Sequence, residues 1–172
     1  MASALERCTI YRGLAEAFRE PAGGVELLDE SLIPPPSKNA TQAFLEAFDP
    51  SVYDSACSLH ESDHSTRGQT SLFEELVRWH EHFGLRRTDT ALLPDHVSAE
   101  LEFMHFLTFS EHKNETDEAG VAALRRAQRD FLTRHLLPLA EAISVKCSSP
   151  EPRYRALAQA LPQFLQTELQ QL

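Results

Sequence analysis

The sequence has few cysteines and few glycines, and each shortage excludes a class of site. Its three cysteines, Cys8, Cys57 and Cys147, lie far apart and include no Cys-x-x-Cys pair, so they indicate neither a disulfide framework nor a zinc knuckle and fit a reducing compartment. The 6 glycines include no Gly-x-Gly-x-x-Gly, phosphate-binding loop or Gly-x-Ser-x-Gly motif. The sequence therefore offers no common signature of a nucleotide-binding or hydrolase site.

Long apolar runs and an excess of basic residues are also missing. No window approaches the roughly 18 apolar residues that suggest a membrane span, and the first residues carry charge where a secretory signal has an apolar core. The 16 Lys and Arg residues against 26 Asp and Glu residues give a formal net charge of −10, which opposes binding to the phosphate backbone of nucleic acid. We therefore expect a cytoplasmic protein that has no membrane span and binds no nucleic acid.

What the sequence does contain is a helical pattern along almost its whole length. Apolar residues recur every three to four positions, and no alternating strand of useful length occurs. A chain of 172 residues is long enough to bury a core as one unit, so we predict a single all-α domain, a helical bundle, over residues 1–172. The expected helices cover residues 5–18, 25–28, 44–48, 72–83, 92–109, 121–143 and 153–172.

Prolines, glycines and polar stretches mark the expected breaks between these helices. The prolines at 34–36 predict an extended linker, and residues 58–70 and 111–120 read as polar connections, the second a plausible hinge. Gly84 suits the end of a helix. Pro138 should kink the helix that contains it, and Pro162 should kink or break the last one.

The expected helix over 92–109 combines an apolar body with a polar start. Apolar side chains cover nearly all its directions, which predicts a central, buried helix. Asp95 suits an N-cap or a first-turn acid, and His96, Glu100 and Glu102 follow closely. Residues 95–118 contain seven acids and one base, Lys113, a local net charge of −6.

This acidic segment beside an apolar helix would suit a partner that is basic next to an apolar stretch. A twin-arginine signal peptide has that character. A solvated acidic face that only aids solubility is the alternative, and composition does not decide between the two.

Two Glu-x-x-His pairs raise the question of a metal. Glu102 with His105 and Glu61 with His64 have the spacing that helical di-iron bundles use twice. The second pair lies in the loop-like stretch, however, and two further glutamates from other helices would be needed. We expect no metal and no cofactor, although a metal-dependent helical-bundle enzyme stays an alternative.

Several segments together resemble a known family. They are Tyr11 to Pro21, Leu72 to Leu85, Leu93 to Met104 with its Asp-His pair, and Phe131 to Pro138 with its His-Leu-Leu-Pro. This combination resembles the TorD/DmsD/NarJ family of molybdoenzyme maturation chaperones, and most closely the branch that serves type II dimethyl sulfoxide reductase-family enzymes.

The resemblance implies an all-helical chaperone that is not itself an enzyme. Such a protein binds the catalytic subunit of a molybdenum oxidoreductase, often through its twin-arginine signal peptide, and holds it for insertion of the molybdenum cofactor before export. A homodimer is compatible with the fold, and a generic helical adaptor is the alternative function. The expected partner-binding residues are Asp95, His96, Glu100 and Glu102 on a polar side, Trp79 and Phe83 on an apolar side, and His60 and Glu61 from the preceding loop.

Overall fold

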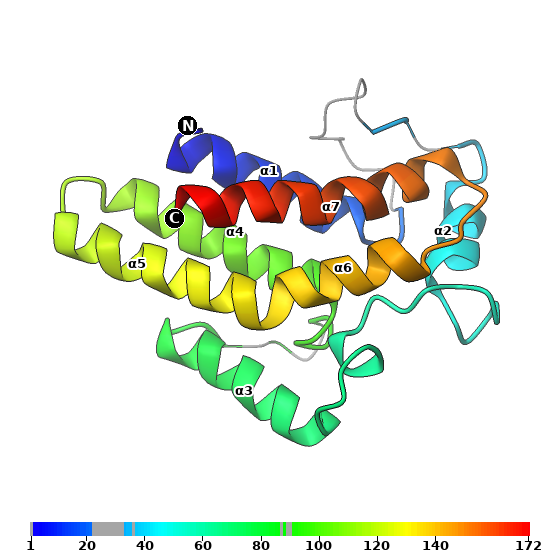
Figure 1. The fold of residues 1–172 in the computed structure, drawn as a ribbon, viewed down its shortest axis with the longest axis horizontal. Helices are drawn as coiled ribbons and strands as arrows, with labels where there is room; N and C mark the ends of the chain where they lie inside the picture. The colour runs from blue at the N-terminus through cyan, green and yellow to red at the C-terminus, as the bar shows by residue number, and fades with distance from the viewer. Residues whose placement is uncertain (1, 22–32, 36, 87, 89–90) are drawn as a thin grey trace.

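The protein is a bundle of helices in the computed structural model, which describes residues 2–21, 33–35, 37–86, 88 and 91–172 (Figure 1). The predicted all-α class is confirmed, because the described residues form helices, turns and one isolated bridge between His60 and His96. The helices are α1 (Ala4–Ala17), α2 (Ala40–Phe48), η1 (Glu61–Asp63), α3 (Gln69–His82), α4 (Val97–Lys113), α5 (Glu118–Phe131), η2 (Leu132–Leu136), α6 (Leu137–Lys146) and α7 (Pro152–Gln171). The short helix expected over 25–28 and part of the proline linker lie outside the described residues.

The helix α4 occupies the centre of the bundle, as its apolar character predicts. Helices α1 and α7 lie along one side of it, α5 and α6 run along another, and α3 stands on the far side of the α5–α6 pair from α1 (Figure 1). The side chains of Val97, Leu101, Met104 and Leu107 are completely buried in the core. Burial on several sides therefore explains why this helix has no continuous polar face.

The start of α4 differs from the expectation in two respects. The helix begins at Val97 and not at residue 92. Its N-cap is His96, whose Nδ1 accepts the backbone N–H of Ser98 at 3.1 Å. Asp95 is neither the cap nor a first-turn acid, because its carboxylate turns away from the helix toward the preceding loop. At the other end α4 continues to Lys113, so its connection to α5 covers only residues 114–117. The single domain over 1–172 and the hinge at 111–120 stay predictions.

The two prolines within helical segments have different effects. Pro138 lacks the N–H that would bond to the carbonyl of residue 134, and the turn just before it, η2, is a π-helix in which Leu137 N–H bonds to Leu132 O. A wider turn accommodates the missing bond. Pro162 is contained within α7, which continues through it without a break.

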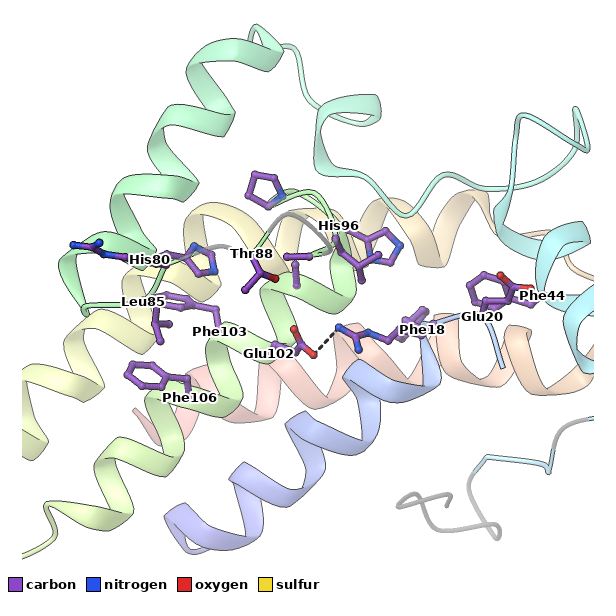
Figure 2. Close-up of a pocket in the computed structure, with 16 residues that line it drawn as sticks. Phe18, Glu20, Phe44, His80, Leu85, Thr88, His96, Glu102, Phe103 and Phe106 are labelled. Atoms are coloured by element: carbon purple, nitrogen blue, oxygen red, sulfur yellow. Dashed lines mark hydrogen bonds and ion pairs between the residues drawn. The ribbon is translucent and has the colours of Figure 1, made fainter. Parts of the chain in front are cut away.

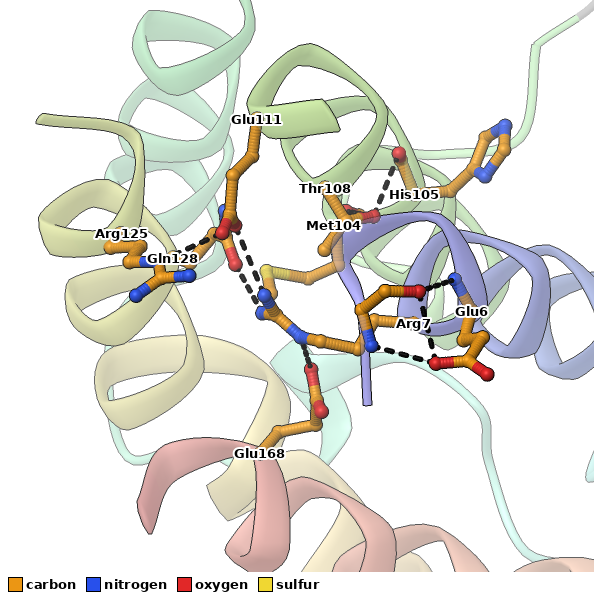
Figure 3. Close-up of polar contacts among 10 residues, drawn as sticks. Glu6, Arg7, Met104, His105, Thr108, Glu111, Arg125, Gln128 and Glu168 are labelled. Carbon is orange, nitrogen blue, oxygen red and sulfur yellow. Dashed lines mark hydrogen bonds and ion pairs between the residues drawn. The ribbon is translucent and has the colours of Figure 1, made fainter. Parts of the chain in front are cut away.

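A buried arginine joins four helices at one end of the bundle (Figure 3). Arg7 Nε on α1 donates to Glu168 Oε2 of α7 at 2.7 Å, and its Nη1 donates to Glu111 Oε2 of α4 at 3.0 Å. Its Nη2 donates to Gln128 Oε1 of α5. Arg125 completes the cluster, with Nε 2.8 Å from Glu111 Oε1. The sequence pattern does not identify Arg7 as a core residue, because its partners lie more than 100 positions away.

Candidate functional site

A pocket of about 820 Å³ opens between the C-terminal end of α1, the first half of α4 and the segment that follows α3 (Figure 2). Four phenylalanines supply most of its aromatic lining, of which Phe18, Phe44 and Phe103 are buried and Phe106 is half-buried. Leu92, which also lines it, is exposed, as is the adjacent Leu93. A largely apolar cavity with a few polar groups is the usual form of a binding site.

An ion pair lies among these aromatic side chains. Arg19 Nη2 donates to Glu102 Oε1 at 2.7 Å, and Arg19 Nε donates to Ser98 Oγ at 3.1 Å. The two charged side chains are 43% and 51% exposed, so both are accessible from the pocket. Arg19 follows α1 and Glu102 lies in α4, and the packing of these two helices brings the residues together.

The loop before α3 is fastened to the start of α4 by Asp95. The Asp95 side chain is completely buried; His60 Nδ1 lies 2.9 Å from its Oδ1, and Ser62 Oγ donates to its Oδ2 at 2.6 Å. Burial alone would disfavour the carboxylate, but the hydrogen bonds from His60 and Ser62 hold the pKa of Asp95 below its usual value. The hydrogen bond to Asp95 also raises the pKa of His60.

Backbone hydrogen bonds strengthen this junction between the loop before α3 and the start of α4. Glu61 N–H donates to Asp95 O, and Val97 N–H donates to Leu59 O, both at 2.8 Å. These two bonds place the ring centroids of His60 and His96 5.0 Å apart, edge to face. Burial and the nearby His60 lower the pKa of His96 to about 4, so His96 lines the pocket as a neutral imidazole at neutral pH.

A buried carboxyl pair lies behind this junction. The Glu100 side chain is completely buried, and no donor among the described residues reaches either of its oxygens. Burial and the neighbouring carboxylate of Glu61 raise the pKa of Glu100 well above its usual value, so a protonated Glu100 can donate to Glu61. His135 of the π-helix holds Glu61 from the other side, with Nδ1 3.1 Å from Glu61 Oε2.

The eight predicted partner-binding residues therefore divide into three groups. His96 and Glu102 line the pocket, while Asp95, Glu100 and Glu61 are buried beneath the junction and His60 is half-buried there. Trp79 and Phe83 are half-buried and pack on the pocket residue Phe103, with ring centroids 6.2 Å and 5.8 Å from it. Direct contact of any of these residues with a partner stays a prediction.

The acidic charge of residues 95–118 is also less exposed than its count of −6 indicates. Asp95, Glu100 and Glu111 are buried, and Glu111 is bound by two arginines. Only the other four acids, Glu102, Glu115, Asp117 and Glu118, are exposed. The segment is therefore not one continuous acidic face.

Neither Glu-x-x-His pair forms a cluster of metal ligands. Glu102 is bound to Arg19 and Glu61 to His135, and within the described ranges no group of three or more His, Cys, Asp or Glu residues could hold a metal ion. Nor does any helix in the described part of the chain have the length and apolar character needed to cross a membrane.

Sequence analysis missed much of the pocket. Phe18, Phe44 and Phe106 fall within expected helices, where an apolar residue predicts core packing, and Arg19 lies just after the first of these helices. Arg19 and Glu102 are 83 positions apart, and no local pattern reveals that they meet. The one available signal was the unusual density of aromatic residues around 103–109.

Comparison with known proteins places the chain in a family. The sequence model for the nitrate reductase delta subunit matches residues 13–144. The perchlorate reductase assembly chaperone protein of Dechloromonas aromatica (strain RCB) is 33% identical over 177 residues, covering 100% of this chain and 75% of the relative. The selenate reductase assembly chaperone protein of Thauera selenatis is 28% identical over 168 residues, 94% of this chain and 87% of the relative. The chlorate reductase assembly chaperone protein of Ideonella dechloratans is 27% identical with the same coverage.

These relatives are named as chaperones and not as catalysts, which supports the expectation that this chain is not an enzyme. The resemblance to molybdoenzyme maturation chaperones, and the chaperone class that it implied, are confirmed. The chain belongs to the nitrate reductase delta subunit family of TorD/NarJ-type chaperones.

Proposed function

We propose that this protein is a system-specific assembly chaperone for the catalytic subunit of a molybdenum reductase of the dimethyl sulfoxide reductase family. The observation that carries the proposal is the correspondence of nearly the whole chain to three reductase assembly chaperones. The match spans at least 94% of this chain in each case. The generic adaptor and the metal-dependent enzyme have no comparable support.

The chemistry of the proposed function is binding, not catalysis. A protein that binds the apo form of a client stabilises that form by mass action, and this would keep the client open for insertion of its molybdenum cofactor. In our proposal the event takes place in the cytoplasm, before export.

The pocket supports a docking role for one segment of the client. Its half-buried Leu85 and Phe106 could receive apolar side chains, while the accessible Glu102 could receive a cation. A twin-arginine signal peptide combines a basic region with an apolar stretch, so we propose it as the segment that enters the pocket. The buried residues Asp95 and Glu100 would then act as positioning residues for the pocket wall.

Affinity purification of the tagged protein from its native host tests the proposed function. We expect a molybdenum-reductase catalytic subunit to co-purify, with its signal peptide intact and its molybdenum content low. An unrelated tagged helical protein serves as the control. If no such subunit is enriched over that control, the proposed function is wrong.

Two variants test whether recovery of the client depends on the pocket. Phe106 is half-buried on the pocket wall, whereas Val145 of α6 is an exposed apolar residue, 86% accessible, that does not line the pocket. Phe106→Ala should reduce recovery of the client several-fold, and Val145→Ala should leave it unchanged. Light scattering on the same samples measures whether the protein is the homodimer that the fold permits.

A further inference from the structure

The ion pair between Arg19 and Glu102 divides the aromatic lining of the pocket into two parts. Figure 2 shows Phe18 and Phe44 on one side of this pair, and Leu85, Phe103 and Phe106 on the other. Phe18, Phe44 and Phe103 are buried, so the apolar surface that an occupant can reach beside the pair is that of the half-buried Leu85 and Phe106. An occupant that packed on Leu85 and Phe106 would therefore lie directly beside the ion pair. The charge of the occupant at that point must therefore complement Arg19 or Glu102.

This ion pair opens more easily than the long-range ion pairs that Arg7 of α1 forms. Arg19 and Glu102 are each about half exposed, and a pair between exposed side chains contributes little to stability because water solvates both charges well. Arg7 and Glu168, by contrast, are almost completely buried. The Arg19 guanidinium also has a second partner, since its Nε donates to Ser98 Oγ, so Arg19 can leave Glu102 and keep one hydrogen bond.

Among the charged residues of the pocket lining, Arg19, Glu20, Arg86 and Glu102, Glu102 is the group that would receive a cation. Glu102 is the acidic residue on the α4 wall, between the two aromatic parts, whereas Glu20 lies at the far end beside Phe44 (Figure 2). His96 is neutral at neutral pH because its pKa is lowered to about 4, so it does not repel a positive charge. Arg86, the other lining arginine, follows Leu85 beyond the end of α3.

We propose that Arg19 is an internal substitute for a basic side chain of the client, and that binding exchanges one for the other at Glu102. An arginine or lysine of the incoming segment pairs with the Glu102 carboxylate, Arg19 remains on Ser98, and an apolar side chain next to the basic residue packs on Leu85 and Phe106. The inference rests on the proposed function and adds the chemistry of the segment that is recognised. It also makes Arg19 a competitor of the client, so the pocket is partly self-inhibited when empty.

The exchange predicts opposite effects on binding for loss of Glu102 and loss of Arg19, whereas two simple contact residues would both weaken binding when lost. Loss of Glu102 should weaken binding of a basic segment, but loss of Arg19 should strengthen it, because the internal competitor is gone. Two synthetic peptides separate these effects. One carries a single arginine between two pairs of leucines, and the other carries citrulline, which has nearly the same shape and no charge, in the same place.

Calorimetric titration of the full-length protein with each peptide provides the test. We expect the arginine peptide to bind the unmodified protein roughly fivefold more tightly than the citrulline peptide, the order expected for one accessible charge pair. Glu102→Gln should remove this preference, and Arg19→Gln should increase it several-fold. Added salt should reduce the preference in the unmodified protein. Trp79 is the single tryptophan and packs on Phe103, so its fluorescence gives a second signal of occupancy.

A matched control comes from α1, the helix that precedes Arg19. Arg12 forms an exposed ion pair with Glu16 at 3.1 Å, and neither residue lines the pocket. Arg12→Gln should bind both peptides as the unmodified protein does. Circular dichroism should show unchanged helix content in every variant, because all the replaced side chains are at least two-fifths exposed.

Three results would overturn the exchange: failure of both peptides to bind, a preference for arginine that persists in Glu102→Gln, or weaker binding of the arginine peptide by Arg19→Gln. Co-purification of the catalytic subunit is measured in parallel. If the subunit still co-purifies when the exchange fails, the exchange is wrong and the chaperone function stands. If it does not co-purify even with the unmodified protein, the proposed function is wrong as well.

Discussion

His60 Nδ1 lies 2.9 Å from Asp95 Oδ1, and this contact ties the loop before α3 to the first residues of α4. The carboxylate is completely buried, whereas the histidine side chain is 33% exposed. Asp95 therefore acts on the pocket indirectly: it holds the loop and the helix start together, and the neighbouring His96 lines the pocket wall.

Asp95→Asn should destabilise the protein. The amide has the shape of the carboxylate but not its charge, so it weakens the bond from His60 and must place an NH₂ group against His60 or Ser62. Hydrogen bonds to a buried charged group contribute about 1.5–3 kcal/mol, and we expect a loss in this range. Urea denaturation followed by circular dichroism measures it. Asp54 is exposed, and Asp54→Asn should change the free energy of unfolding little; an equally small effect of Asp95→Asn would contradict the positioning role.

The same contact predicts a pH dependence of stability. The hydrogen bond to Asp95 raises the pKa of His60 above its usual 6.5, so the folded protein holds this proton more tightly than the unfolded chain does. The stabilisation is fully present below pH 6.5 and is lost as the pH rises through the higher folded-state pKa. Urea midpoints measured from pH 6 to pH 9 should therefore fall less steeply for His60→Gln than for the unmodified protein. Parallel curves would show that His60 contributes no such stabilisation.

Glu100 predicts a second pH dependence of stability, which a separate variant tests. Burial and the charge of Glu61 raise the pKa of Glu100 well above 4.5, so the folded state favours the protonated carboxyl and loses stability as the pH rises above that value. Glu100→Gln keeps the shape and a hydrogen-bond donor toward Glu61 but cannot ionise. We expect the two proteins to have similar free energies of unfolding near pH 5, and the variant to become the more stable one as the pH increases. A constant difference across this range would contradict a protonated Glu100.

The elements that sequence analysis predicted well are those that depend on local pattern. The central helix was evident because apolar side chains surround it, and the end of α3 was evident because Gly84, with φ of 74°, adopts a conformation that favours glycine. The expected helix over 92–109 included Asp95 in its first turn, but α4 begins at Val97 and His96 is its cap. An acid before a helix is normally its cap, and only the distant His60 and Ser62 determine that this one is not.

The pocket could not be predicted in the same way because its polar contacts join segments far apart in the chain. Arg19 meets Glu102 only after α1 has packed on α4. The count of acids over residues 95–118 overestimated the exposed negative charge for the same reason. Charge along a sequence does not distinguish the buried Glu111, which binds Arg7, from the exposed Glu115. Long-range pairing decides which charges face water.

The last prediction concerns Arg7, the buried residue that binds two carboxylates. Arg7→Met fills similar space but leaves Glu168 and Glu111 without this cation, and Glu168 has no other ion-pair partner among the described residues. Removing one member of a buried pair typically costs about 3–5 kcal/mol, because the remaining charge stays desolvated. At roughly 2–4 °C per kcal/mol for a chain of this size, calorimetry should show a melting temperature lower by on the order of 10 °C.

Two further variants test whether the uncompensated charge causes this loss. Arg12→Met breaks an ion pair in the same helix whose members are 62% and 43% exposed, and it should change stability by less than about 0.5 kcal/mol. Adding Glu168→Gln to Arg7→Met removes the stranded charge, so the double variant should be more stable than Arg7→Met alone. If Glu168→Gln instead adds its own loss to that of Arg7→Met, the cluster stabilises the bundle through packing, and the charge of Glu168 is not what Arg7 compensates.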